Sequence, residues 1–170
     1  NNFSISQCQD IIKGHNVKLW QKRITDDDFL TLPIGIGNLP MQIEIKYPEE
    51  HFSLDEDNLL DEVHKLGQKE RILKDVPITY SFYDNVATGI VGNYKINKDF
   101  IDRLILQIVT RYSYDEVKIV LLTSMENEAA WDYVKVLPHC WSNDKTFRYF
   151  ASSNDEYREI AYNLEKVFQS

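Results

Sequence analysis

The segment from Gly89 to Lys95 (GIVGNYK) carries the residue types of a phosphate-binding loop, because two glycines precede a lysine near the start of a predicted helix. In the P-loop pattern GxxxxGK[ST], backbone N–H groups surround a phosphate, the lysine reaches the β and γ oxygens, and a hydroxyl holds magnesium. With Lys95 in the lysine position, Tyr94 replaces a glycine and Ile96 replaces the hydroxyl residue. Isoleucine cannot bind magnesium, and tyrosine is strained where a loop needs a positive φ.

We therefore interpret Gly89, Gly92 and Lys95 as a degenerate P-loop position, in which the glycines allow a tight strand-to-helix turn. The second acidic motif of such NTPases is an apolar strand that ends in aspartate or glutamate. Residues 117–122 (VKIVLL) form such a run, but the next three residues carry no carboxylate, and Glu126 is better placed to begin a helix. Both parts of the phosphate machinery are missing, so we predict no catalytic residue and no bound cofactor in this segment.

Other residues that could do chemistry have spacings that favour structural roles. His139 and Cys140 are neighbours whose side chains usually point apart, which makes a poor nucleophile–base pair. The acidic runs 26–28 and 55–57 could bind a cation, but acidic residues at helix starts usually act as caps on a solvated face, and neither run fits an EF-hand loop. The remaining histidines lack the spacing of a metal site: His15, His51 and His64. We expect no metal site.

The composition is that of one ordinary globular domain, with 170 residues, 43% hydrophobic and 27% charged. The formal net charge of −8 opposes binding to a phosphate backbone, so nucleic acid is excluded as the main partner. Cys8 and Cys140 form no CxxC pair and are expected to be free thiols. No apolar run reaches the roughly 18 residues of a membrane helix. Because the first residue is Asn1 rather than Met, we expect a segment of a longer protein.

The first half of the chain predicts helices at its two ends and strands between them. Residues 4–13 have the apolar stripe of a helix, which Gly14 can end. Residues 16–23 are expected to be extended, with Val17, Leu19 and Trp20 as candidate buried residues, and 25–28 to form a turn or helix start. Residues 32–37 and 41–47 are expected as strands joined by 38–40, followed by a helix over 53–73 that begins with a capping box.

The second half alternates predicted strands and helices. Strands are expected at 77–83, 86–92, 117–123 and 146–152, and helices at 97–112, 126–134 and 154–168. The last helix is expected to point Tyr157, Ile160, Ala161, Leu164 and Phe168 inward. This alternation predicts an α/β fold with a mainly parallel sheet flanked by helices. The three tryptophans and ten tyrosines could form an interface, but filling the core explains them equally well.

A series of short motifs occurs in one order along residues 17–150: LWQKR (19–23), DDDFL (26–30), LPIGIG (32–37), VPI (76–78), GIVG (89–92), LILQI (104–108), YD (114–115), WDY (131–133), LPH (137–139) and Trp141. This series resembles the EssC/EccC proteins, which are membrane-anchored FtsK/SpoIIIE-type ATPases of type VII secretion. The motifs are most similar to the domain between the membrane helices and the first full ATPase module. The resemblance implies an ATPase-like (RecA-like, P-loop-like) α/β fold with a degenerate nucleotide site and a β-rich N-terminal extension.

The resemblance also implies a domain order and a setting. Residues 1–16 would be a helix that follows the membrane region, and residues 17–170 a single degenerate ATPase-like domain. The domain would lie on the cytoplasmic side of the cell membrane. Its partners would be the adjacent ATPase module of the same chain, other type VII secretion membrane subunits and, in the full-length protein, further copies of itself. ATP and magnesium would belong to other modules.

Three functions remain open from the sequence. The first is a non-catalytic domain that couples the membrane portion to the motor modules or acts as a scaffold. The second is a divergent NTPase half-site completed in trans by a neighbouring module, with Arg103, Arg111 or Arg148 as an arginine finger. The third is an independent interaction domain whose acidic surface recruits a basic segment.

Overall fold

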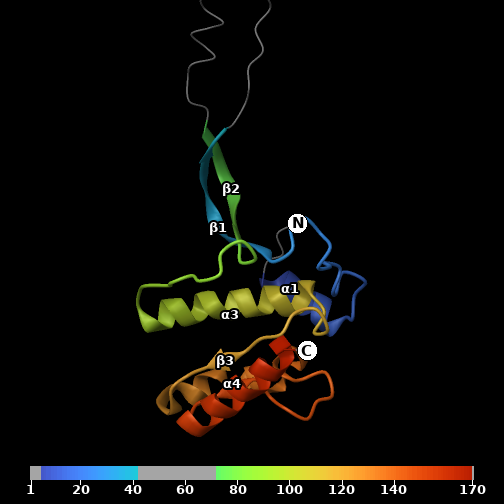
Figure 1. The fold of residues 1–170 in the computed structure, drawn as a ribbon. Helices are drawn as coiled ribbons and strands as arrows, with labels where there is room; N and C mark the ends of the chain where they lie inside the picture. The colour runs from blue at the N-terminus through green and yellow to red at the C-terminus, as the bar shows by residue number, and fades with distance from the viewer. Residues whose placement is uncertain (1–4, 42–71, 170) are drawn as a thin grey trace, which may run out of the picture. The chain divides into compact units, whose positions relative to one another are not determined.

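The computed structural model describes residues 5–41 and 72–169, which fall into two compact units (Figure 1). The larger unit contains residues up to 32 and from 81 onward, and the smaller unit contains residues 33–80. The helices are α1 (Ile5–Lys13), α3 (Tyr94–Arg111), the 3₁₀-helices η1 (Met125–Val136) and η2 (Pro138–Cys140), and α4 (Asn154–Gln169). The strands are β1 (Thr31–Pro40), β2 (Ile72–Ser81), β3 (Leu121–Leu122) and β4 (Phe150–Ala151).

Helix α3 joins the two hydrophobic clusters of the larger unit. Its Ile105 and Val109 pack with residues of η1, η2 and β4 in one cluster, and its Leu104 packs with Phe29 and Tyr112 in the other. Burying a large apolar side chain contributes about 1.5–3 kcal/mol, so this helix organises the core. The predicted helix is confirmed. It begins three residues earlier than expected because the side chain of Asn93 caps its first turn.

Helix α1 is confirmed and packs beside α3 (Figure 1). Its Cys8 and Ile11 are buried, as the apolar stripe predicts. The helix ends at Lys13, but the left-handed residue that follows is His15, with φ of 45°, rather than Gly14. The predicted boundary between residues 16 and 17 stays a prediction.

Strands β3 and β4 form a parallel pair, with Leu121 opposite Phe150 and Leu122 opposite Ala151. The N–H groups of Ile119, Leu121 and Thr123 all donate toward the same side, to the carbonyls of His139, Tyr149 and Ala151. Parallel pairing is therefore confirmed. Within the described residues the only other sheet is the pair β1–β2, so the full parallel sheet that we expected is not present there.

The smaller unit is built on the antiparallel pair β1–β2. A Cβ on Gly37 would lie 3.1 Å from Cγ1 of Ile78, so glycine permits the two strands to approach closely. β1 continues through Pro40, so the connection that we expected at 38–40 is wrong, and Ile72 and Leu73 belong to β2 rather than to a helix end. The remaining predictions for residues 42–71, including the helix, the 55–57 acidic run, His51 and His64, lie outside the described residues.

The strand predicted at 86–92 is wrong, because this segment has no regular secondary structure. Val86 and Val91 are fully exposed, so ordering them as a strand would bury no apolar surface. The two glycines of the segment add an entropic cost to any strand. The same reasoning applies at 16–23, which forms turns and leaves Val17 88% exposed.

Helix α4 is confirmed, but its inward face is narrower than predicted. Ile160 is buried and Tyr157 and Leu164 are half-buried, which gives one stripe at helical spacing. The hydroxyl of Tyr157 donates to the carbonyl of Thr123 and so ties this helix to the end of β3. Ala161 and Phe168 are exposed, because they lie away from this stripe or beyond the part of the helix that packs.

Candidate functional site

The start of α3 occupies the place where a phosphate-binding loop was sought. Asn93 is the N-cap, and its side-chain oxygen accepts the backbone N–H of Lys95 at 2.9 Å. Lys95 is exposed in the first turn, and Gly89 and Gly92 precede it in an exposed loop. A Cβ on Gly92 would lie 2.8 Å from the Asn97 side-chain oxygen, so a close approach explains this glycine. These contacts describe a capped helix start.

Tyr94 does not have the strained backbone that we expected. Tyr94 was expected to be strained by a positive φ, but it is the first residue of α3 and its φ is not positive. None of the described glycines has a positive φ either. The prediction that this turn holds no phosphate therefore rests on Ile96 rather than on strain at Tyr94.

The opposite end of α3 is capped by a segment far away in sequence. The last carbonyls of a helix have no partner within it. Trp20 donates its indole N–H to the carbonyl of Val109 at 3.0 Å and its backbone N–H to the carbonyl of Thr110 at 2.9 Å. Lys22 donates its backbone N–H to the carbonyl of Arg111 at 3.0 Å. The turns at 16–23 therefore satisfy the C-terminus of the helix.

His139 completes this cap. It is 1% exposed, and its Nε2 lies 2.9 Å from the carbonyl oxygen of Tyr112. A carbonyl can only accept, so Nε2 carries the proton and Nδ1 has the lone pair. Burial lowers the pKa of His139, and the nearby charge of Lys118 lowers it further. The buried imidazole is therefore a neutral structural donor.

Cys140 follows His139 in the chain but takes part in a different contact. It is fully buried, and its Sγ donates to the carbonyl of Tyr149 at 3.3 Å. Burial raises the pKa of the Cys140 thiol to about 11, so it stays protonated and is a poor nucleophile. The structural role predicted for His139 fits this geometry, and His139 and Cys140 contact different carbonyls, those of Tyr112 and Tyr149.

A cluster of charged and aromatic side chains joins α3 to η1. Lys98 Nζ lies 2.7 Å from one carboxylate oxygen of Asp102, and the hydroxyl of Tyr133 donates to the other at 2.6 Å. The ammonium of Lys98 also lies 4.6 Å from the ring centre of Trp131. Burial and the Asp102 carboxylate raise the pKa of Tyr133. The i,i+4 spacing of Lys98 and Asp102 is visible in the sequence, but nothing local places Tyr133 beside them.

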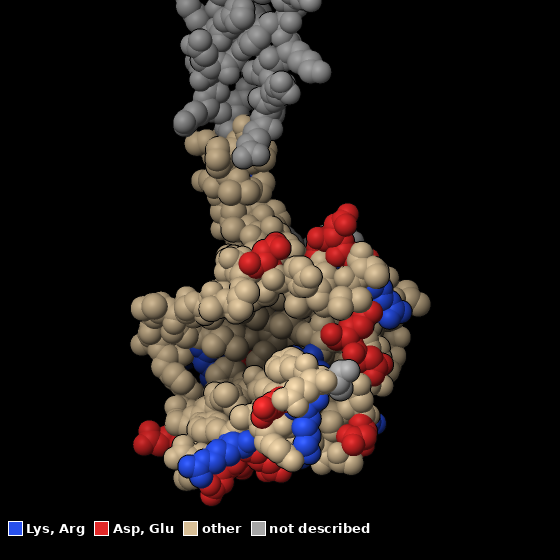
Figure 2. All heavy atoms as spheres, in the orientation of Figure 1, with Lys and Arg blue, Asp and Glu red and all other residues tan. Residues whose placement is uncertain are grey.

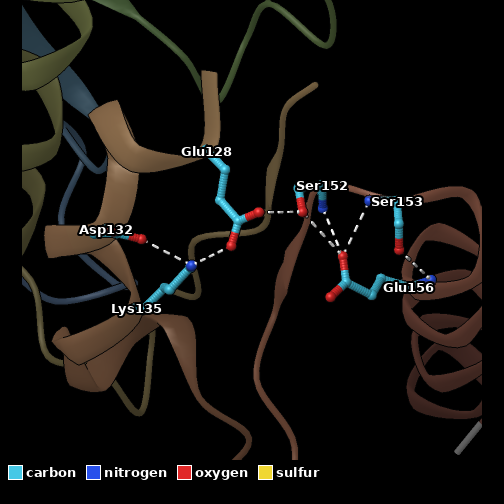
Figure 3. Close-up of polar contacts among 6 residues, drawn as sticks. All are labelled: Glu128, Asp132, Lys135, Ser152, Ser153 and Glu156. Atoms are coloured by element: carbon cyan, nitrogen blue, oxygen red, sulfur yellow. Dashed lines mark hydrogen bonds and ion pairs between the residues drawn. The ribbon is translucent and has the colours of Figure 1, made fainter. Parts of the chain in front are cut away.

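Figure 3 shows two further carboxylates, Glu128 of η1 and Glu156 of α4, which both accept a hydrogen bond from Ser152. Glu128 accepts from Lys135 Nζ at 2.6 Å and from the hydroxyl of Ser152 at 2.8 Å. Lys135 also contacts Asp132 at 2.8 Å. The hydrogen bond from Lys135, and then that from Ser152, lowers the pKa of Glu128.

The second carboxylate belongs to a capping box at the start of α4. Glu156 accepts the backbone N–H groups of Ser152 at 2.8 Å and Ser153 at 3.0 Å, and its own N–H lies 3.5 Å from the hydroxyl of Ser153 (Figure 3). These backbone bonds lower the pKa of Glu156. In the sequence, this capping box corresponds to the S-x-x-E pattern at 153–156.

The three candidate arginine fingers lie in different surroundings. Arg103 is exposed on α3, Arg111 is half-buried at its last turn, and Arg148 lies 4.4 Å from the ring centre of Trp141. Within residues 5–41 and 72–169, no group of three or more metal-ligating side chains comes together. On the face shown in Figure 2, acidic and basic side chains are interspersed, with no single basic patch.

Comparison with known proteins adds an independent observation. No protein-family model matches the chain. The ESX secretion system protein EccC of Geobacillus thermodenitrificans (strain NG80-2) is 27% identical over 137 residues, which cover 80% of this chain and 9% of EccC. The ESX secretion system protein YukB of Bacillus subtilis (strain 168) is 26% identical over 167 residues, which cover 95% of this chain and 11% of YukB. The type VII secretion system protein EssC of Staphylococcus aureus (strain NCTC 8325 / PS 47) is 20% identical over 166 residues, which cover 96% of this chain and 11% of EssC.

The chain is homologous to the EccC and EssC secretion-system proteins. The resemblance drawn from the ordered motifs is thereby confirmed, and the chain spans about a tenth of the length of these relatives. Two residues of the ordered motifs, Trp20 and His139, meet at the C-terminus of α3. Among the described helices, none is both long and apolar enough to cross a membrane.

Proposed function

We propose that this chain is a non-catalytic domain of a membrane-anchored type VII secretion protein, on the cytoplasmic side of the membrane. It couples the membrane portion to ATPase modules that bind ATP and magnesium, or acts as a scaffold between them. The homology to EccC, YukB and EssC over 80–96% of the chain supports a role in secretion. The parallel pair β3–β4, on which α3 packs, supports a relationship to ATPase-like folds.

The start of α3 carries the argument for a non-catalytic role. A phosphate at a helix N-terminus is held by free backbone N–H groups. Here the N–H of Lys95 is taken by the side chain of Asn93 at 2.9 Å. Ile96 stands where a hydroxyl side chain is required to bind magnesium, and its side chain has no oxygen. These features support the proposal that this turn does not bind a triphosphate.

Nucleotide binding and turnover of the isolated chain test this proposal. We expect no saturable ATP binding and no magnesium-dependent hydrolysis above a blank, in the wild type and in Lys95→Ala alike. Hydrolysis that disappears in Lys95→Ala would refute the non-catalytic role. The secretion role is tested in cells, where full-length protein with Lys95→Ala should export substrate at the wild-type level. A double variant that removes the α3 cap, Trp20→Ala with His139→Ala, should reduce export.

The alternative, a half-site completed in trans, is favoured by one observation. Arg103 is exposed and, within the part of the chain that the structure describes, its side chain has no hydrogen bond or ion pair. Mixing the chain with the neighbouring ATPase module and comparing wild type with Arg103→Ala separates the two functions. A coupling domain predicts equal ATP turnover in both mixtures, whereas an arginine finger predicts a loss of turnover in the variant.

A further inference from the structure

Residues 16–24 form a strap that crosses the C-terminal end of α3 (Figure 1). No residue of the strap is buried, and Val17 and Ile24 are 88% and 60% exposed. Buried residues lie on either side of it, Ile11 of α1 before the strap and Phe29 after it. Segments that bury little apolar surface open locally at low free energy, so the strap can open while its two anchors stay packed.

Hydrogen bonds from Trp20 and Lys22 hold the strap on α3. The backbone N–H of Trp20 donates to the carbonyl of Thr110 at 2.9 Å, and its indole N–H donates to that of Val109 at 3.0 Å. The backbone N–H of Lys22 donates to the carbonyl of Arg111 at 3.0 Å. The three carbonyls are consecutive along the helix, so these bonds can break together in one movement of the strap.

The strap also makes internal hydrogen bonds and a weak ion pair. The side chain of Asn16 accepts the backbone N–H of Lys18, and its carbonyl accepts that of Leu19, so both bonds stay intact when the strap moves. The guanidinium of Arg23 lies 3.8 Å from the carboxylate of Glu116. Ion pairs in contact with solvent contribute little to stability, so this one does not prevent opening.

Trp20 carries backbone strain while the strap is closed. Its φ is 56°, in the left-handed region that bulky side chains rarely adopt. Strain of this kind persists only where the surrounding contacts impose it. Here the two hydrogen bonds from Trp20 to α3 impose it, so breaking them lets φ return to negative values. The strain therefore favours the open strap, and the hydrogen bonds favour the closed one.

We propose that the strap is a conformational switch, which opens as one unit while the rest of the larger unit stays folded. Opening uncovers the carbonyls of Val109 and Thr110 and the ring of Tyr114, which Trp20 faces at 5.4 Å between ring centres in the closed strap. Carbonyls at a helix C-terminus carry partial negative charge, so the uncapped end of α3 can accept hydrogen bonds from a cationic group. This inference goes beyond the proposed function, because it holds whether or not the chain acts in coupling.

Native-state hydrogen exchange of the full 170-residue chain, followed by NMR at low concentrations of urea, tests the strap. The backbone amides of Trp20 and Lys22 report on the strap, and those of Leu104 and Ile105 report on the buried part of α3. After correction for intrinsic rates, we expect the two strap amides to exchange at least about tenfold faster than the two helix amides. Their exchange should also be nearly independent of urea, because opening the strap exposes little surface.

A static cap gives the opposite pattern of exchange. If the strap opens only when the whole larger unit unfolds, its amides share the exchange rate and the urea dependence of Leu104 and Ile105, and the proposal is overturned. Clearly different protection of the Trp20 and Lys22 amides overturns the movement of the strap as one unit. These measurements use the wild type, so they do not depend on the folding of a variant.

Substitutions at position 20 test whether strain favours the open strap. Trp20→Ala and Trp20→Gly both remove the ring and the indole hydrogen bond, but only glycine adopts a φ of 56° without strain. We expect the amide of Lys22 to exchange about fivefold faster in Trp20→Ala than in Trp20→Gly. Val17→Ala, at an exposed position of the strap, is the matched control and should leave this exchange unchanged. Equal exchange in the two variants at position 20 overturns the contribution of strain.

Discussion

The indole N–H of Trp20 donates to the carbonyl oxygen of Val109 at 3.0 Å, across 89 positions of the sequence. The backbone N–H of the same residue binds the carbonyl of Thr110, the next residue along the helix. A single residue near the N-terminus therefore satisfies two of the carbonyls that end α3. This contact links the turns at 16–23 to the helix that organises the core.

Replacing Trp20 by phenylalanine should remove the indole hydrogen bond and keep an aromatic ring that faces Tyr114, now 5.4 Å away between ring centres. The Val109 carbonyl would then lack its partner, so the free energy of unfolding should fall by about 1 kcal/mol. Urea denaturation followed by far-UV circular dichroism measures this change. Val17→Ala, at an 88% exposed position in the same segment, should leave the midpoint unchanged. An equal effect of both substitutions would contradict the capping role.

Titration of His139 should make the free energy of unfolding depend on pH below about pH 6.5. Its folded-state pKa is lowered by burial, so the unfolded chain binds a proton first as the pH falls. The contribution of neutral His139 to the free energy of unfolding is complete above about pH 6.5. Below that pH it is lost, by at most about 1.4 kcal/mol per pH unit. His139→Gln keeps an N–H donor but does not titrate, so its stability should be flatter between pH 6.5 and 5.

Urea midpoints measured at half-unit steps of pH test this expectation. His15→Asn is the matched control, because His15 is exposed and asparagine tolerates its left-handed backbone. That control should keep the slope of the wild type. Parallel curves for the wild type and His139→Gln would show that the imidazole is not the titrating group.

The capping box of α4 should contribute to stability through both of its residues. Ser153→Ala and Glu156→Gln should each cost about 1 kcal/mol, and the double variant should cost less than the sum because the two share one set of bonds. The lowered pKa of Glu156 means that its contribution is present above about pH 4.5 and is lost as the pH falls below that value. Glu159→Gln, an exposed residue of the same helix, should be neutral in thermal denaturation.

The bond between Tyr133 and Asp102 should hold η1 against α3. Tyr133→Phe removes a hydroxyl that donates to the carboxylate at 2.6 Å, and should cost about 1 kcal/mol. Hydrogen exchange of the η1 amides should accelerate in this variant. Tyr162→Phe, on the exposed face of α4, changes the same atom and should alter neither measurement. Unchanged hydrogen exchange of the η1 amides in Tyr133→Phe would show that this bond does not hold η1 against α3.

Local patterns determined the helices. The apolar stripes at 4–13, 97–112 and 154–168 and the S-x-x-E pattern at 153–156 depend on residues three and four apart, and these are neighbours in any helix. The sequence also predicts that a magnesium ligand is missing at position 96, because the side chain of Ile96 has no oxygen wherever it is placed. The ordered motifs were enough to identify the homology to secretion-system proteins.

Tertiary structure decided the rest. The segment 86–92 has the composition of a strand but forms none, because a strand needs a partner and buried surface, and Val86 and Val91 find neither. Trp20 and His139 were candidates for an interface or for a structural role, and only the fold shows that both cap α3. Their partners are backbone carbonyls, which every residue carries, so no pattern of side chains along the chain could specify them.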